Sequence, residues 1–167
     1  MIRLLLFTLC LIPFFINAQI HTLKTYLSFE GGGNGIVASA NIGRTLLVKD
    51  RFKIIFQTGL GWTPKTALSV VPVNIPSQLT CCFGDRTFFL EAGIGSTVIF
   101  ESKIDIPESK KSKTELYLLP VLGFRHETER WFGRMYICPL IHATGKHLYD
   151  DVTSDFVKIG LSVGTVF

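Results

Sequence analysis

The segment 157–167 alternates between two kinds of side chain, and this alternation constrains the fold more than any other feature of the chain. Large apolar residues dominate the odd positions, whereas small or polar residues occupy the even ones from 158 to 164. Successive side chains of a β-strand point to opposite faces, so a period of two predicts a strand with one apolar face. The apolar face comprises Val157, Ile159, Leu161, Val163, Thr165 and Phe167, and the opposite face comprises Lys158, Gly160, Ser162 and Gly164.

The same alternation recurs along the chain, and turn residues separate its copies at fairly even intervals. Helical periodicity is nearly absent beyond the N-terminal segment. The alternating segments match or exceed the roughly 9 to 11 residues that a tilted strand needs to cross a membrane. We therefore expect an all-β fold, a single closed antiparallel transmembrane β-barrel of about eight strands. The predicted strands are 22–30, 36–46, 51–62, 70–79, 87–100, 115–126, 131–141 and 155–167.

The N-terminus has the pattern of a cleavable signal peptide. Arg3 precedes an apolar run over residues 4–16, and Ala18 supplies the small residue that a signal peptidase prefers. The run is shorter than the roughly 20 residues of a membrane-spanning helix. We expect a signal peptide over residues 1–18 and one barrel domain over residues 19–167.

Charge and cysteine content exclude several classes of protein. The net charge of +4 is too small to indicate nucleic-acid binding. Beyond the signal peptide the chain has Cys81, Cys82 and Cys138, an odd number that allows at most one internal disulfide. Adjacent Cys81 and Cys82 lack the spacing of metal ligands, so we interpret them as semi-buried or loop thiols and expect no metal and no cofactor.

Aromatic residues give a stricter test of a membrane barrel, because they should face the lipid near both ends of the apolar band. The aromatic residues near the predicted strand ends occupy the alternate positions whose side chains face outward, which we call outward parity. They form two groups. If both termini face the periplasm, the periplasmic group contains Phe52, Phe88, Phe124, Trp131 and Phe167, and the opposite group contains Phe29, Trp62 and Phe100.

The connections between predicted strands also differ in length between the two ends. Those near Val48, Gly84 and Thr128 are short, whereas segments 101–113 and 142–154 are longer, as is typical of outer-membrane barrels. The first hairpin has a short Gly-rich tip, residues 31–35, in which Asn34 and Gly35 give a type I′ turn signal. The tip lacks the following Lys and Ser or Thr of a phosphate-binding loop.

The segment 156–167, which ends on Phe167, looks like the C-terminal strand by which outer-membrane barrels are recognised for assembly. Together with the signal peptide, the tip 32–35, and the segments 90–95 and 120–125, it makes the chain resemble the small outer-membrane β-barrel family of the OmpA/OmpX type. The resemblance implies a monomer in the bacterial outer membrane, in contact with lipid, lipopolysaccharide and the barrel assembly machinery. It leaves the activity open, because such families include adhesins, envelope-stability proteins and lipid-modifying enzymes.

Inward parity collects charges of both signs, with Tyr26 and Tyr136 as further polar groups. An eight-stranded barrel is just wide enough for side chains to fill, so we expect paired charges to plug the lumen rather than line a small-solute channel. A charged interior also disfavours a soluble barrel that carries an apolar ligand. The predicted ion-pair network comprises Lys24, Glu30, Lys53, Glu91, Arg125, Arg134 and Lys158.

An alternative interpretation is a lipid A-modifying enzyme with a His/Ser/Asp site at the outer rim. The candidates are His142, His147, Ser154 and Asp150, although no spacing fixes a nucleophile beside a base. In the segment 101–113, Lys110, Lys111 and Lys113 are candidates for contact with the phosphates of lipopolysaccharide. The leading expectation is a non-enzymatic outer-membrane barrel with a structural or surface-interaction role.

Overall fold

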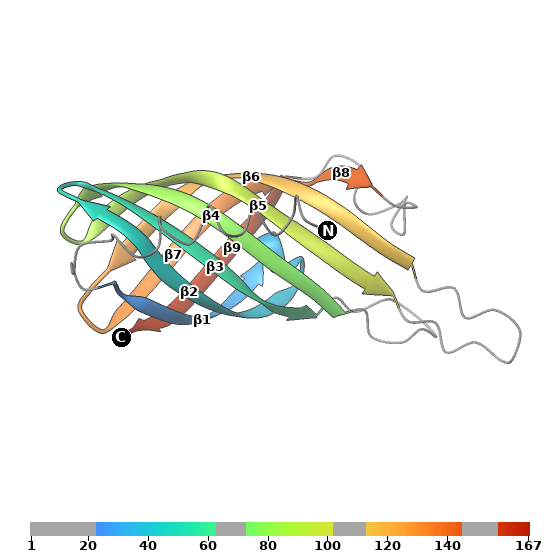
Figure 1. Ribbon diagram of the computed structural model, residues 1–167, viewed down its shortest axis with the longest axis horizontal. Helices are drawn as coiled ribbons and strands as arrows, with labels where there is room; N and C mark the ends of the chain where they lie inside the picture. The colour runs from blue at the N-terminus through green and yellow to red at the C-terminus, as the bar shows by residue number, and fades with distance from the viewer. Residues whose placement is uncertain (1–22, 63–72, 102–112, 145–156) are drawn as a thin grey trace, which may run out of the picture.

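The computed structural model describes residues 23–62, 73–101, 113–144 and 157–167, and these residues form a β-barrel (Figure 1). No helix within these ranges is long and apolar enough to cross a membrane. The elements are β1 (Thr25–Gly32), η1 (Gly33–Gly35), β2 (Ala38–Lys49), β3 (Phe52–Trp62), β4 (Val73–Asp85), β5 (Phe88–Glu101), β6 (Lys113–Glu127), β7 (Trp131–Pro139), β8 (Ile141–Thr144) and β9 (Val157–Val166).

The strands form one closed antiparallel sheet. Each of β1 to β5 pairs with the next strand in the chain, and β9 lies between β7 and β1. Strands β7 and β8 both pair with β6 and are separated by Leu140, so together they act as one interrupted strand. The predicted closed antiparallel barrel of eight strands is confirmed.

Strand positions agree with the sequence analysis, and the differences have local causes. The predicted strand 70–79 is too short, because β4 continues to Asp85 and pairs with β5 along its whole length. Cys81 and Cys82 therefore lie within a strand, and Cys81, Cys82 and Cys138 are free thiols. The predicted strand 131–141 ends at Pro139, where proline lacks the backbone N–H that continuous pairing requires.

Three short turns lie at one end of the barrel, which we call the turn end. They join β2 to β3 near Asp50, β4 to β5 near Arg86, and β6 to β7 near Thr128. The C-terminus lies at the same end, and there Phe167 exchanges two backbone hydrogen bonds with Thr25, of 2.9 and 3.0 Å. We call the opposite end the far end.

The barrel has its apolar side chains outside and most of its polar side chains inside. Leu161 and Val163 on β9 are 57% and 60% exposed, whereas Ser162 between them is buried. The same alternation places Lys53, Glu91, Arg125 and Arg134 in the interior on other strands. This arrangement is the reverse of that in a water-soluble protein and follows from the period of two in the sequence.

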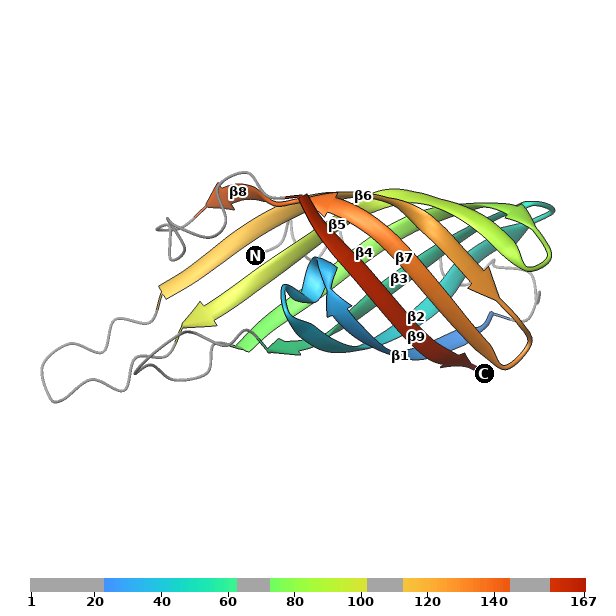
Figure 2. The same ribbon diagram turned by 180° about the vertical axis from the view of Figure 1, so that it is seen from behind.

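The tip between β1 and β2 differs from the type I′ turn that its Asn-Gly sequence predicts. Residues Gly33, Asn34 and Gly35 form the short 3-10 turn η1, and all three are buried (Figure 2). Gly32 and Gly33 have positive φ angles of 72° and 58°, which glycine adopts without the steric penalty of a Cβ. The chain thereby folds back into the lumen instead of extending beyond the strands.

Candidate functional site

The interior of the barrel at the turn end contains a network of ion pairs centred on Glu127. Its carboxylate oxygen Oε2 lies 2.6 Å from Lys53 Nζ and 2.8 Å from Arg125 Nε, and Oε1 lies 3.4 Å from Lys24 Nζ. Lys53, Arg125 and Glu127 are buried, and the side chain of Lys24 is 40% exposed. One carboxylate therefore pairs with three cations, which come from the residue before β1, from β3 and from β6.

Glu91 on β5 is the second acidic centre of this network. Its carboxylate oxygens lie 2.9 Å from Arg134 Nε and 3.4 Å from Arg125 Nη1. The thiol of Cys82 donates to Glu91 Oε1 over 3.6 Å. Arg125 contacts both Glu91 and Glu127, so the two acidic centres form a continuous network across the lumen.

Aromatic rings pack against the buried cations. The Arg125 guanidinium lies 3.8 Å from the centre of the Phe132 ring and 4.4 Å from that of Tyr26. Lys53 Nζ lies 3.8 Å from the Phe89 ring centre, and the Arg134 guanidinium lies 4.2 Å from that of Tyr136. Such cation–π contacts stabilise charges that have been removed from water, and the rings fill space between the ion pairs.

A second cluster, formed around Asn34, fills the lumen between this network and the far end. The backbone N–H of Asn34 donates to Tyr136 Oη over 2.8 Å, and its side-chain amide donates to the Ser77 carbonyl over 3.0 Å. The Thr97 hydroxyl lies 2.6 Å from the Asn34 carbonyl and 2.7 Å from its Oδ1. Asn34 thus links η1 to strands β4, β5 and β7.

The residues beside Asn34 attach the rest of the segment 31–36 to the wall. Gly35 N–H donates to Glu30 Oε1 over 3.2 Å, and the Asn74 amide donates to the Gly35 carbonyl over 3.2 Å. A Cβ on either Gly33 or Gly160 would overlap the Tyr136 side chain, so both glycines make room for its hydroxyl to reach Asn34.

Ile36 closes the segment in an unusual backbone conformation. Its φ and ψ angles are 68° and −64°, and Val37 N–H donates to the Gly35 carbonyl over 2.9 Å. This is a γ-turn with positive φ, a strained conformation that is uncommon for a β-branched residue. The Ile36 side chain packs against an apolar cluster inside the lumen that includes Tyr117, Leu119 and Tyr136. Burial of the side chain offsets the backbone strain.

The structure places the predicted inward residues in the interior, with different partners. Lys24, Lys53, Glu91, Arg125 and Arg134 join the ion-pair network, whereas Glu30 contacts η1 instead. Lys158 has inward parity and is half-buried, but it makes no ion pair with the part of the chain that the structure describes.

Two buried acids were absent from the predicted network. Glu127 has the parity of Arg125 but lies one residue beyond the predicted strand 115–126, so extending that strand by one position would have found it. Glu115 on β6 is fully buried, and its carboxylate accepts a 2.8 Å hydrogen bond from Tyr117 Oη. It begins the predicted strand 115–126, and its inward position there, the same as that of Arg125, is the signal that would have found it.

The outward aromatic residues lie on the surface of the barrel in the two predicted groups. Phe52 alone among the eight is half-buried, because its ring packs against that of Phe83 with centroids 4.9 Å apart. The exposed ones are Phe29, Trp62, Phe88, Phe100, Phe124, Trp131 and Phe167.

The catalytic and lipopolysaccharide candidates lie mostly outside the described residues, namely His147, Asp150, Ser154, Lys110 and Lys111. Lys113 begins β6, but its side chain also lies outside them. His142 lies on β8, half-buried, with its ring 5.3 Å from that of Tyr117. Within the described ranges no group of three His, Cys, Asp or Glu residues could hold a metal ion.

Comparisons with known proteins agree with this architecture. The N-terminal β-barrel domain of Pseudomonas aeruginosa OprF superimposes with a TM-score of 0.57 at 11% sequence identity, over 87% of this chain and 96% of that domain. Ail, the attachment invasion locus protein of Yersinia pestis, gives a TM-score of 0.43 at 10% identity over 87% and 95% of the two chains. No family model matches the chain, and no curated protein matches it in sequence. The resemblance to small outer-membrane barrels is confirmed at the level of the fold.

Proposed function

We propose that the protein is a bacterial outer-membrane β-barrel with a closed lumen and a structural or surface-interaction role, without enzymatic activity. The observation that carries this proposal is the reversed polarity of the barrel. An apolar outer wall suits lipid, and a closed ring of paired strands satisfies backbone hydrogen bonds within the wall, as a bilayer requires.

The aromatic residues support the same placement. Phe29, Trp62 and Phe100 lie towards the far end, and the larger group, from Phe52 to Phe167, lies towards the turn end. Aromatic girdles at both interfaces are typical of membrane barrels. We propose that the turn end faces the periplasm, that residues 1–18 are a signal peptide, and that the closed ring functions as a monomer.

The contents of the lumen support a closed barrel rather than a channel. Buried ion pairs cross the interior at the turn end, and Asn34 with its neighbours fills the space beyond them. An eight-stranded barrel leaves no further room for a water-filled path once such side chains occupy it.

The proposal includes two contacts outside the barrel. Phe167, which is exposed and directly follows β9, would carry the recognition signal for the barrel assembly machinery. Lys110, Lys111 and Lys113 would contact lipopolysaccharide phosphates at the far end. Replacing Phe167 with Asp should lower the yield in the membrane, and normal yield would remove the first contact from the proposal.

Cell fractionation, with gel mobility before and after boiling, tests the membrane placement. We expect the protein in the outer-membrane fraction, with an unboiled form that migrates differently from the boiled one. A soluble protein whose mobility is unaffected by boiling would overturn the placement. Planar-bilayer recording of the purified protein tests the closed lumen separately, and steady conductance would favour a small-solute channel instead.

A further inference from the structure

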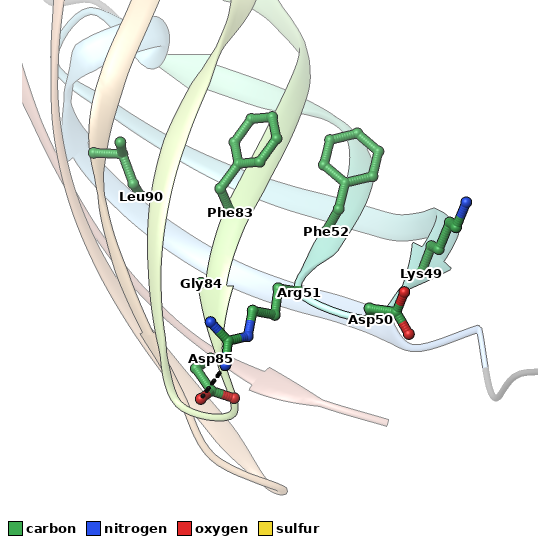
Figure 3. Close-up of a pocket in the computed structure, with 8 residues that line it drawn as sticks. All are labelled: Lys49, Asp50, Arg51, Phe52, Phe83, Gly84, Asp85 and Leu90. Atoms are coloured by element: carbon green, nitrogen blue, oxygen red, sulfur yellow. Dashed lines mark ion pairs between the residues drawn. The ribbon is translucent and has the colours of Figure 1, made fainter.

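A groove of about 650 Å³ lies on the outer wall at the turn end (Figure 3). Residues of β2, β3, β4 and β5 and of the turn between β2 and β3 form it. Its lining residues are Lys49, Asp50, Arg51, Phe52, Phe83, Gly84, Asp85 and Leu90.

The floor of the groove is one row of outward side chains that crosses neighbouring strands. Phe52 is directly opposite Phe83, and Phe83 is directly opposite Leu90 in the strand register. Side chains in such a row lie next to one another, and the Phe52 and Phe83 rings are 4.9 Å apart. On the other side of Phe52 the row ends at Lys49 of β2, which is directly opposite Phe52 in the strand register. The apolar floor therefore begins beside a cation and continues into the apolar wall.

The rim of the groove carries two charges of each sign. Arg51 and Asp85 form an ion pair of 3.8 Å, with side chains that are 80% and 68% exposed. In Figure 3 Arg51 and Asp85 lie together at one side of the pocket, Asp50 lies in the neighbouring turn, and the Lys49 ammonium points away from the pair at the other side. Exposed pairs of this kind exchange readily with other ions, because water screens them and each contributes little stability.

We propose that this groove binds one zwitterionic phospholipid whose headgroup carries a phosphate and a primary ammonium. Arg51 binds the phosphate, Asp85 beside it binds the ammonium, and an acyl chain lies over Phe52, Phe83 and Leu90. The Arg51–Asp85 pair selects this class, since a lipid with phosphate alone engages Arg51 and leaves the Asp85 carboxylate without a partner. The inference rests on the proposed membrane placement, which brings the turn end to a phospholipid leaflet.

The test is lipid retention by the folded full chain, reconstituted in vesicles of equal parts phosphatidylethanolamine and phosphatidylglycerol. After gentle detergent extraction, mass spectrometry of the intact protein counts the bound lipids. We expect one bound phosphatidylethanolamine per protein, retained in preference to phosphatidylglycerol. Arg51→Ala should lower its retention about tenfold, which corresponds to the loss of about 1.4 kcal/mol from one charge-assisted hydrogen bond. Phe83→Ala should also lower it.

Matched controls lie elsewhere on the barrel. Arg130 is an exposed cation at the same end, outside the groove, and Phe29 is an exposed outward ring towards the other end. Arg130→Ala and Phe29→Ala should leave retention unchanged. Equal loss in these controls, equal retention of both lipids, or a protein dimer that forms without lipid would overturn the inference. Heat-shifted gel mobility of the same sample reports insertion, so a barrel that inserts but retains no lipid refutes this site and leaves the membrane placement intact.

Discussion

The two halves of the lumen contain different kinds of contact. At the turn end, side chains from the wall meet as ions, with Glu91 and Glu127 between lysine and arginine partners. Towards the far end, a piece of main chain enters the lumen and makes hydrogen bonds through Asn34. The first half depends on which residues face inward, whereas the second depends on the path of the backbone.

This difference determines how much stability is lost when a contact is removed from each half by substitution. Removing one member of a buried ion pair leaves the other charged and desolvated, which is strongly destabilising. Removing one neutral hydrogen bond leaves at worst an unpaired dipole, which costs less. The arginine side chain of Arg134 connects the halves, since it pairs with Glu91 and packs on the ring of Tyr136.

Glu91→Gln should have the largest effect, because it leaves Arg134 and Arg125 without a full counter-charge at that point. We expect the free energy of unfolding in lipid vesicles, measured by urea titration, to fall by about 3 to 5 kcal/mol. Asp85→Asn breaks an exposed pair and serves as the control, with a change below about 1 kcal/mol. If the two variants lost the same stability, the turn-end half would not depend on buried charge.

Leu161→Arg changes the outer wall, and its loss of stability can be compared with the losses from changes in either half of the lumen. Leu161 is exposed near the middle of β9, and an arginine facing lipid near the bilayer midplane costs about 2 to 4 kcal/mol. The same urea titration measures it, with Leu161→Met as a volume-matched control. A neutral Leu161→Arg variant would contradict the outward assignment of this face in a membrane.

Tyr136→Phe probes the far half by removing the hydroxyl that accepts from Asn34 N–H. The ring stays in place, and the buried N–H loses its acceptor, so we expect a loss of about 1 to 3 kcal/mol in the same assay. Tyr26→Phe removes a hydroxyl at the turn end that bonds Thr45 and donates to Glu127, and it provides a comparison from the other half. Hydrogen exchange at Asn34 should rise in Tyr136→Phe alone; unchanged exchange would mean that this bond does not hold the segment.

Substitutions of Ile36 should give the smallest difference in the free energy of unfolding, and glycine should be tolerated better than alanine at this position. Ile36→Ala loses packing and keeps the strained φ, whereas Ile36→Gly loses packing but relieves strain of about 1 to 3 kcal/mol. We therefore expect the glycine variant to unfold at higher urea concentration than the alanine variant. The reverse order would show that the γ-turn at Ile36 stores no strain.

Much of the barrel follows from its sequence because wall residues obey a strict local rule. Parity alone places Arg125 inside and Phe124 outside, whatever their partners are. The same rule reaches Glu127 once the strand end is correct, but strand ends depend on turn contacts such as the bond between Thr128 and the Trp131 carbonyl. The identity of each ion pair depends on the stagger of strands around the ring, which no single strand specifies.

The entry of Asn34 into the lumen could not be predicted in this way. Locally, an Asn-Gly pair between two strands has the properties of an exposed turn. Its burial depends on partners that are distant in the chain, namely Ser77, Thr97 and Tyr136, and on the space left by Gly160. A lone Asn-Gly signal carries no information about those partners.

The position of Gly160 has a consequence for how the barrel is completed. Gly160 lies on the last strand, opposite Gly32 on the first, so the seam that closes the ring also forms one wall of the site that holds η1. The inserted turn belongs to the hairpin of β1 and β2, whereas part of its enclosure comes from β9, which is distant in the chain. The pairing of β9 with β1 therefore both closes the ring and completes the wall around η1, and a chain without β9 would lack both.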